Sequence, residues 1–197
     1  MKKVSAVILA SGLGSRFGKN KLLARIGDQL LGTIAANELL NLPNHYLKNI
    51  ILVTPYQQLA DSVPKKITVI NNPDQYLGQS HSLQLGLNET KNSDGIIFLN
   101  ADQPFIKADI IRSLIDAFQK DDKIIVPRVN KIPKSPCIFP RRFFSSLSEL
   151  HGDCGGRIIF RENPAEIIYI DFPDSTAFFD IDTPADMKSA TEIINRK

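Results

Sequence analysis

An unbroken apolar run that ends in a glycine-rich, basic segment constrains the fold of this chain most strongly. Residues 4–10 are apolar or small without alternation, which is typical of a strand buried on both faces of a parallel sheet. Glycines after such a strand let backbone N–H groups approach a ligand and point at it together. The segment supplies both glycines and cations: Gly12, Gly14, Gly18, Arg16, Lys19 and Lys21. A polyanion, first of all a triphosphate, is the expected ligand.

Two common phosphate-binding loops do not fit this segment. A P-loop requires Gly-Lys-Ser/Thr with a second glycine five positions earlier, whereas Asn20 follows Lys19 and Leu13 occupies the earlier position. A dinucleotide fingerprint requires its third glycine where this chain has Phe17. A tight basic turn between a strand and a helix remains the alternative interpretation.

Strands and helices are predicted to alternate along the chain, which indicates an α/β sheet with helices on both faces. A helix is expected over 108–119, where apolar residues recur at helical spacing. The last helix is expected to begin at Pro184, with Thr183 as its N-cap. Ligands of such sheets collect at the carboxyl ends of the strands. The predicted strands are 4–10, 49–54, 67–70, 95–100, 123–126 and 166–171.

Aspartates follow two of the later segments. Asp102 comes just after the apolar strand 95–100, and Asp180 and Asp182 precede the last helix. Side chains two apart in an extended segment point the same way, so these carboxylates are expected to meet Asp102 and hold Mg²⁺, which prefers carboxylate and phosphate oxygens. The alternatives are that Asp102 only starts a turn and that Asp182 caps the helix.

A third polar segment follows the predicted strand 67–70. It contains Asn72, Gly78, Ser80 and Ser82, which offer N–H and hydroxyl donors at the positive end of a helix. These donors suit a base edge, a ribose or a phosphate. A serine-capped helix without a ligand is the alternative.

Length and composition predict one enzyme domain over residues 1–197. A chain of 197 residues buries roughly 70% of its unfolded surface. The net charge of +3 is dispersed, so nucleic acid is not the favoured partner. The chain shows no signal peptide and no run long enough to span a membrane. Cys137 and Cys154 form no CxxC pair and are expected to be free thiols in a cytoplasmic protein.

The first loop resembles the signature loop of nucleotidyltransferases, which move an NMP from an NTP to a phosphorylated acceptor. It reads Leu-Ala-x-Gly-x-Gly-Ser-Arg-x-Gly-x-x-Lys-x-Leu from Leu9 to Leu23. The resemblance implies that Arg16 and Lys21 neutralise the triphosphate and stabilise the departing pyrophosphate. With the third segment it implies these nucleotide-binding residues: Leu9, Ala10, Ser11, Gly12, Gly14, Ser15, Arg16, Lys21, Asn72, Gly78, Ser80 and Ser82.

The ordered set of later motifs is similar to that of molybdenum cofactor cytidylyltransferases. The set is Gly-x-Ser-x-Ser-Leu at 78–83, Ala-Asp-Gln-Pro at 101–104, Gly-Asp-x-Gly at 152–155 and Asp-Ile-Asp-Thr-Pro at 180–184. The resemblance implies a three-layer α/β/α, Rossmann-like fold with a mostly parallel mixed sheet, as in nucleotide-diphospho-sugar transferases. It makes Asp102 and Asp182 the Mg²⁺ ligands. It also implies acceptor-binding residues: Pro136, Gly152, Asp153, Gly155 and Arg157.

The implied reaction transfers CMP from CTP to the terminal phosphate of molybdopterin and releases pyrophosphate. Ser11, where related guanylyltransferases carry glycine, favours CTP over GTP. Cys154 and Gly156 depart from the family pattern in the acceptor region. The alternatives are guanylylation, another acceptor such as a sugar phosphate, a polyol phosphate or phosphocholine, and a non-catalytic chaperone that delivers molybdopterin to a molybdenum hydroxylase apoprotein. The basic loop 128–142 is a candidate for the acceptor's anionic end, although solvated surface is the commoner role of such charges.

Overall fold

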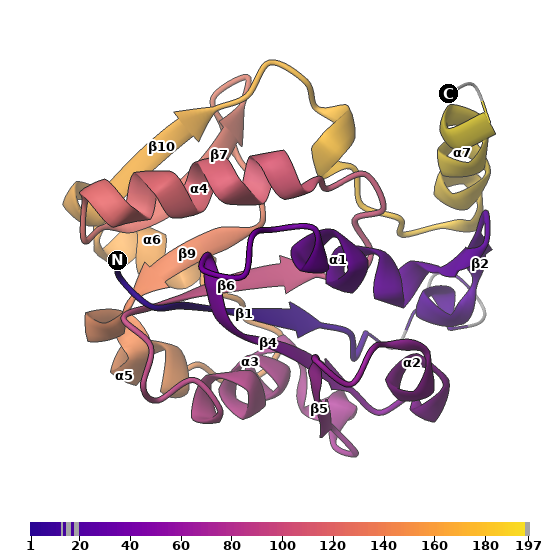
Figure 1. Ribbon diagram of the computed structural model, residues 1–197, viewed down its shortest axis with the longest axis horizontal. Helices are drawn as coiled ribbons and strands as arrows, with labels where there is room; N and C mark the ends of the chain where they lie inside the picture. The colour runs from indigo at the N-terminus through magenta and orange to yellow at the C-terminus, as the bar shows by residue number, and fades with distance from the viewer. Residues whose placement is uncertain (13, 15–16, 18–19, 196–197) are drawn as a thin grey trace.

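A mixed β-sheet with helices on both faces forms the centre of the molecule. The computed structural model describes residues 1–12, 14, 17 and 20–195. In Figure 1, α1 and α4 lie on one side of the sheet, and α3 and α5 lie on the other. From edge to edge, the main path of the sheet runs through β10 (Ile167–Asp171), β7 (Ile124–Val129), β9 (Cys137–Pro140), β6 (Gly95–Asn100), β1 (Val4–Leu9), β4 (Leu47–Thr54) and β5 (Thr68–Asn71).

Helices and short pairings complete the fold. Two further two-residue strands, β2 (Arg25–Ile26) and β3 (Gln29–Leu30), form a separate hairpin, and β8 (Ile132–Pro133) pairs with β7. The α-helices are α1 (Leu31–Leu40), α2 (Gln57–Ser62), α3 (Gln79–Asn88), α4 (Ala108–Lys120), α5 (Phe144–Ser148), α6 (Arg157–Glu162) and α7 (Pro184–Asn195). Single 3₁₀ turns are η2 (Lys21–Leu23), η3 (Gln75–Leu77), η4 (Arg141–Phe143), η5 (Pro164–Glu166) and η6 (Thr176–Phe178).

The sheet is mostly parallel, as predicted. β1 pairs in parallel with β4 and with β6, and β4 pairs in parallel with β5. β9 runs antiparallel between β6 and β7, and β10 returns parallel to β7. The predicted three-layer, Rossmann-like α/β/α fold is therefore confirmed. The carboxyl ends of β1 and β6 lie side by side, which brings the segments that follow them together.

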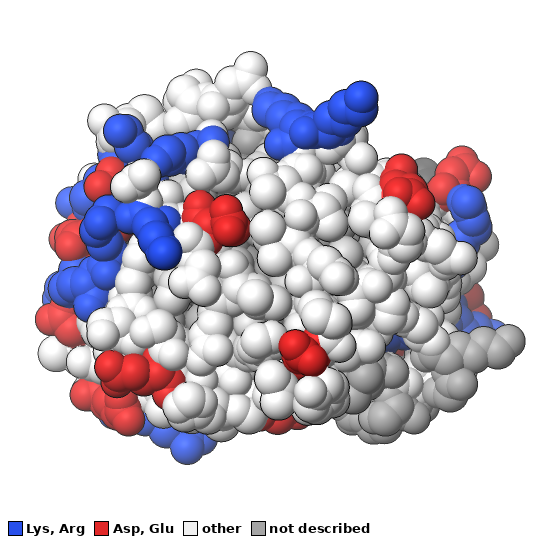
Figure 2. Space-filling model, turned by 90° about the horizontal axis from the view of Figure 1, so that it is seen from below, with Lys and Arg blue, Asp and Glu red and all other residues white. Residues whose placement is uncertain are grey.

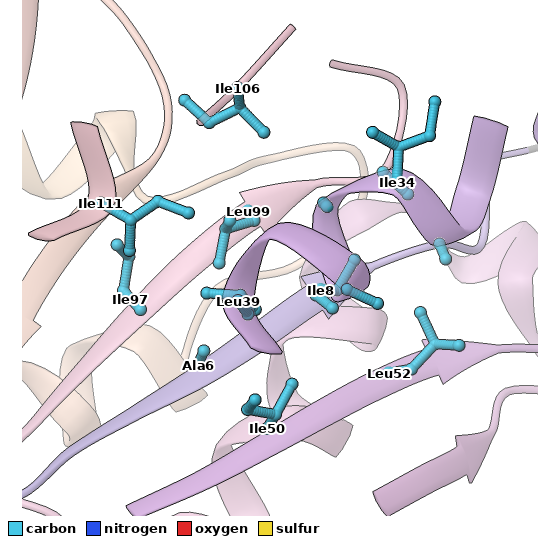
Figure 3. Close-up of a cluster of buried hydrophobic side chains, with 14 of the residues drawn as sticks. Ala6, Ile8, Ile34, Leu39, Ile50, Leu52, Ile97, Leu99, Ile106 and Ile111 are labelled. Carbon is cyan, nitrogen blue, oxygen red and sulfur yellow. The ribbon is translucent and has the colours of Figure 1, made fainter. Parts of the chain in front are cut away.

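The first strand explains why the chain begins with an apolar run. Ala6 and Ile8 of β1 pack toward α1, with Leu39 among their neighbours in Figure 3. Val7 faces the opposite layer and packs with Leu83 of α3. Both faces of the strand are buried, so apolar residues are required at successive positions rather than at every second one. The strand predicted from this run is confirmed.

The remaining predicted elements are present in the structure, and one central strand was missed. All six predicted strands are present with boundaries shifted by up to three residues, and the helix over 108–119 is α4. β9, a buried strand between β6 and β7, was missed because Pro136 and Pro140 bracket it and prolines are typical of loops. The segment 128–142 is therefore not a single basic loop. It contains the end of β7, then β8, then β9.

The last helix begins as predicted. Thr183 Oγ1 accepts a hydrogen bond from the Asp186 N–H at 3.2 Å, and the Thr183 N–H donates to Asp186 Oδ2 at 2.7 Å. This reciprocal capping satisfies N–H groups that have no partner within the helix. The Thr183 hydroxyl, which donates to Asp186 Oδ2 at 2.8 Å, and the Thr183 N–H together lower the pKa of the Asp186 carboxyl. The start of α7 is thus held next to Asp182.

Charged side chains of both signs share the surface. Figure 2 shows one face with Lys, Arg, Asp and Glu residues intermixed along one margin and a largely uncharged centre. In salt solution, the fields of such neighbouring opposite charges cancel within a short distance of the surface.

Within the part of the chain that the structure describes, no helix combines the length and the apolar character that crossing a bilayer demands.

Thiol reactivity tests the placement of the two cysteines. Cys137 is buried in β9, and burial raises the pKa of its thiol to about 12. Cys154 is partly exposed. Because thiolates are the reactive form, we expect native protein to react with one equivalent of a chromogenic disulfide reagent at neutral pH, and unfolded protein with two. Cys154→Ser should abolish the native reaction, and rapid modification of both thiols in folded protein would contradict the burial of Cys137.

Candidate functional site

A cavity of about 470 Å³ lies at the carboxyl ends of β1 and β6. Its walls come from the segments after β1, β5 and β6, from the loop before α6 and from the segment before α7. The lining residues are Leu9, Ser11, Gly12, Gly14, Lys21, Leu22, Gln75, Tyr76, Leu77, Gly78, Gln79, Ser82, Asn100, Asp102, Gly152, Asp153 and Asp182. The cavity therefore gathers most of the segments that the sequence analysis selected.

A lysine and two aspartates meet in this cavity. Lys21 Nζ lies 2.8 Å from Asp102 Oδ2 and 3.0 Å from Asp182 Oδ1, and it donates a further hydrogen bond of 2.6 Å to the Ile181 carbonyl. Burial by itself lowers the pKa of Lys21, but the charges and hydrogen bonds of Asp102 and Asp182 outweigh burial and raise it above its usual value. The lysine is thus held fully protonated at neutral pH.

Backbone hydrogen bonds bring these three side chains together. The Ala101 N–H donates to the Leu9 carbonyl at 3.2 Å, which extends the β1–β6 pairing up to Asp102. The Ile181 N–H donates to the Asp102 carbonyl at 3.0 Å, so the chain before α7 is joined to the same point. Asn20 Oδ1 accepts from the Leu22 N–H at 3.1 Å and caps the 3₁₀ turn that carries Lys21.

Asp180 faces a different partner from Asp182. Gln103 Nε2 donates to Asp180 Oδ1 at 2.9 Å. Burial, together with the nearby charge of Asp102, raises the pKa of Asp180. This hydrogen bond is a second connection between the segment after β6 and the segment before α7.

The donor set of the cluster fits a hard divalent cation. Asp102 Oδ1 is buried and has no hydrogen-bond partner among the described residues, and the oxygens of two carboxylates are suitable ligands for Mg²⁺. The described residues include no group of three or more His, Cys, Asp or Glu arranged to hold a metal. Phosphate oxygens and water are the remaining ligands that such a cation requires.

The glycine-rich segment forms one wall of the cavity. The Ala10 N–H and the Ser11 hydroxyl both donate to the Val53 carbonyl, at 2.9 and 3.1 Å. Ser11 lines the cavity while its hydroxyl is engaged by the Val53 carbonyl. Gly14 has φ of 61°, a conformation that favours glycine. Ser15 and Arg16, both predicted to bind nucleotide, lie outside the described residues.

Two glycines cross at the opposite wall. A Cβ placed on Gly78, which has φ of 91°, would lie 2.5 Å from backbone atoms of Gly152. The Ser80 N–H and hydroxyl donate to the Gly152 carbonyl at 3.2 and 2.8 Å. Asn72 Nδ2 donates to Ser82 Oγ at 2.9 Å. Ser80 and Asn72 thus hold this wall in place from behind it, and of the predicted residues here only Gly78 and Ser82 line the cavity.

The predicted acceptor residues are divided by the structure. Gly152 and Asp153 line the cavity, and a Cβ on Gly155 would lie 2.9 Å from Gln79 Oε1. Arg157 is exposed at the start of α6, and Pro136 precedes β9, so neither lies in the cavity lining. Two of the five predicted acceptor residues therefore line this cavity, and the other three lie outside its lining.

Six lining residues were not predicted: Leu22, Gln75, Tyr76, Leu77, Gln79 and Asn100. Asn100 ends a buried strand next to Asp102, so the rule that ligands bind at strand ends was sufficient to find it. Tyr76 is 70% exposed, and no motif marks the turn that carries it.

Two arginines of the segment 128–142, a candidate for binding the acceptor's anionic end, form ion pairs within the protein. Arg128 pairs with Asp171, and Arg142 pairs with Asp122 and Glu166.

Fold and site together define a nucleotide-binding α/β protein of the nucleotidyltransferase superfamily. The chain belongs to the family of MobA-like NTP transferase domains, whose model matches residues 6–167. The description of this family gives the chain a nucleotidyltransferase activity with an NTP-type substrate. The prediction of a nucleotidyltransferase from the first loop is confirmed at this level.

Individual relatives share the whole length of the chain at low identity. The purine catabolism protein PucB of Bacillus subtilis (strain 168) is 26% identical over 193 residues, which cover 90% of this chain and 91% of PucB. Rv0371c from Mycobacterium tuberculosis H37Rv has a similar structure, with a TM-score of 0.83 and 21% identity. The match covers 97% of this chain and 98% of the Rv0371c chain. Its complex with manganese gives a TM-score of 0.76, with 22% identity and coverage of 96% and 98%. The structure of CMP:2-keto-3-deoxy-manno-octonic acid synthetase complexed with CTP matches with a TM-score of 0.80 and 13% identity. This match covers 98% of this chain and 99% of the synthetase chain.

Replacing Lys21 tests the ion cluster without assuming a substrate. Lys21→Met leaves two carboxylates without their cation, and we expect it to lower the free energy of unfolding by about 1–3 kcal/mol at neutral pH. This is less than for a fully buried pair because the Asp182 side chain is 40% exposed. The folded-state pKa of Lys21 lies above the unfolded value of 10.5. The stabilisation is therefore complete below pH 10.5 and is lost as the pH rises through the folded-state pKa.

Urea unfolding of wild type and Lys21→Met from neutral to alkaline pH measures this difference. Lys107→Met is the matched control, because Lys107 pairs with Glu38 but its side chain is 56% exposed, and exposed pairs contribute little. The ion cluster would be contradicted if Lys21→Met and wild type had the same free energy of unfolding at neutral pH, or if their difference persisted unchanged far above pH 10.5.

Proposed function

We propose that this chain, as a single nucleotidyltransferase domain over residues 1–197, transfers CMP from CTP to the terminal phosphate of molybdopterin. The observation that carries this proposal is that the Lys21, Asp102 and Asp182 cluster and the glycine-rich segment line one cavity. A triphosphate needs backbone donors and cations, and a phosphate acceptor needs a polar site beside it. Glycines, Lys21 and further polar residues that suit these requirements line one cavity of about 470 Å³, which supports the proposal.

The reaction is an in-line displacement without a covalent enzyme intermediate. A phosphate oxygen of the acceptor forms a bond to the α-phosphorus of CTP, the bond to the bridging oxygen breaks, and pyrophosphate leaves. The acceptor phosphate is already ionised, so no general base is needed. The protein contributes positioning and charge stabilisation. Lys21, held protonated, supplies positive charge, and Arg16 is proposed to do the same.

Asp102 and Asp182 are the residues that would hold Mg²⁺. The bound cation supplies neutralisation of phosphate charge and orientation of phosphate oxygens. Asp102 Oδ1 is buried and has no hydrogen-bond partner in the described part of the chain, which supports this role. A manganese complex of the structural neighbour Rv0371c is consistent with a divalent ion in this fold. The two carboxylates also keep Lys21 directed at the cavity.

The assignment of CTP and molybdopterin depends on the ordered motifs and on Ser11 rather than on the cavity alone. A structural neighbour complexed with CTP shows that this fold accommodates that nucleotide in another protein. Gly152 and Asp153, in the motif that the cytidylyltransferases share, line the same cavity as Lys21 and are proposed to contact the acceptor.

Pyrophosphate release measured over a matrix of nucleotides and acceptors tests the proposal. CTP with molybdopterin and Mg²⁺ should give the highest kcat/KM, and omission of the divalent ion should abolish turnover. Higher kcat/KM with GTP, or with a sugar phosphate, a polyol phosphate or phosphocholine, would replace the proposed substrate. Tight binding of molybdopterin without pyrophosphate release from any pair would indicate a carrier instead.

The catalytic contribution of Asp102 is tested by Asp102→Asn. Removing a preorganised charged group costs on the order of 10²–10³ in rate, so kcat should fall by that factor with the preferred substrates while circular dichroism stays unchanged. Asp109→Asn is the control, because Asp109 lies on the exposed side of α4 and its side chain is 81% exposed. Full activity of Asp102→Asn would remove Asp102 from the reaction.

A further inference from the structure

One tyrosine connects the two walls of the cavity. Tyr56 lies between β4 and α2, and its phenol oxygen is 3.0 Å from the Gly12 carbonyl oxygen and 2.7 Å from Gln75 Oε1. The Asn20 side chain is a further hydrogen-bond partner of this phenol. Gly12 and Asn20 stand at the two ends of the glycine-rich segment, and Gln75 belongs to the turn on the other wall.

The backbone of Tyr56 is itself well anchored. Its N–H donates to Thr54 Oγ1 at 3.2 Å, and its carbonyl accepts from the Leu59 and Ala60 N–H groups at 3.0 and 3.2 Å. Thr54 ends β4, the strand that pairs directly with β1. The phenol is therefore presented from the rigid sheet. Burial raises the pKa of the Tyr56 hydroxyl, so it remains a hydrogen-bond donor at neutral pH.

Packing does not hold Gly12 in the same way as it holds Gly78. A Cβ built on Gly12 has no atom within 4 Å, whereas one built on Gly78 meets Gly152 at 2.5 Å. Among the described residues, none packs where a side chain at position 12 would begin, so the hydrogen bond to the Gly12 carbonyl is a contact that holds this position. The Tyr56 hydroxyl donates this hydrogen bond.

We propose that Tyr56 is a positioning residue, which holds Gly12 and Asn20, the described ends of the glycine-rich segment, at the spacing from the 75–78 turn that a nucleoside triphosphate requires. Tyr56 itself is absent from the cavity lining, and it acts through Gly12, Asn20 and Gln75. The proposal rests on the proposed function, because it takes the glycine-rich wall to be the triphosphate site. It is independent of the acceptor's identity.

Tyr56→Phe removes the hydroxyl and keeps the ring. Loss of one net hydrogen bond corresponds to roughly a three- to tenfold effect, so we expect the Kd of CTP with Mg²⁺, from titration calorimetry, and the KM for CTP to rise by that factor. The KM for the acceptor and kcat at saturating CTP should stay unchanged, because the hydroxyl contributes to binding in the ground state and the transition state alike.

Tyr46→Phe is the matched control. The Tyr46 phenol interacts with Asp116 of α4 rather than with a cavity wall, so its removal should leave both constants unchanged. A cycle that combines Tyr56→Phe with Gln75→Leu adds a second measurement. The two effects on the Kd of CTP should be less than additive if both residues act through one hydrogen bond.

The outcomes separate the two proposals. Unchanged Kd and KM for CTP in Tyr56→Phe, with wild type active, would overturn the role of Tyr56 and leave the proposed function standing. A fall in kcat and a rise in both KM values together would indicate a general structural role and would also overturn it. Absence of both nucleotide binding and pyrophosphate release in wild type would overturn the proposed function and, with it, this inference.

Discussion

The contact of Lys21 with Asp102 and Asp182 is the interaction on which the arrangement of the site depends. These residues are 81 and 161 positions from Lys21 in sequence, and three separate segments must converge for them to meet. The cost of bringing two carboxylates together in a partly buried place is offset by the ammonium between them. The same contact fixes the end of the glycine-rich segment and the start of α7.

The order of the strands in the sheet brings these three segments to the same place. Because β1 and β6 are parallel neighbours, their carboxyl ends deliver Gly12 and Asp102 to one edge. The chain before α7 is then added by the hydrogen bond from Ile181 to the Asp102 carbonyl and by the Gln103 to Asp180 pair. On the other side, close glycine contacts bring the turn after β5 against the loop before α6. A rigid sheet thus carries a site made almost entirely of loops.

Much of this was predictable because it depends on local pattern. The unbroken apolar run at 4–10 requires burial on both faces, and Thr183 with Pro184 marks a helix start whatever surrounds it. The glycine-rich segment and Asp102 are recognisable from the residues beside them. β9 was not predictable in this way, since its prolines are typical of loops and only its pairing with β6 and β7 makes it a strand. Tyr56 carries no local signal either, because its partners at Gly12 and Gln75 are distant in sequence.

The sequence by itself determined the α/β fold, the strand that leads into the glycine-rich wall and the charged residues available for phosphate chemistry. Periodicity and capping act over a few residues, and a linear reading is sufficient for them. Only the tertiary structure decided which charges meet: Lys21 between two aspartates, Arg128 and Arg142 paired with carboxylates outside the cavity, and Arg157 exposed away from the lining. Electrostatic energy depends on the distance between charges and on their burial. The order of the strands sets both quantities, and no single segment of the sequence contains that order.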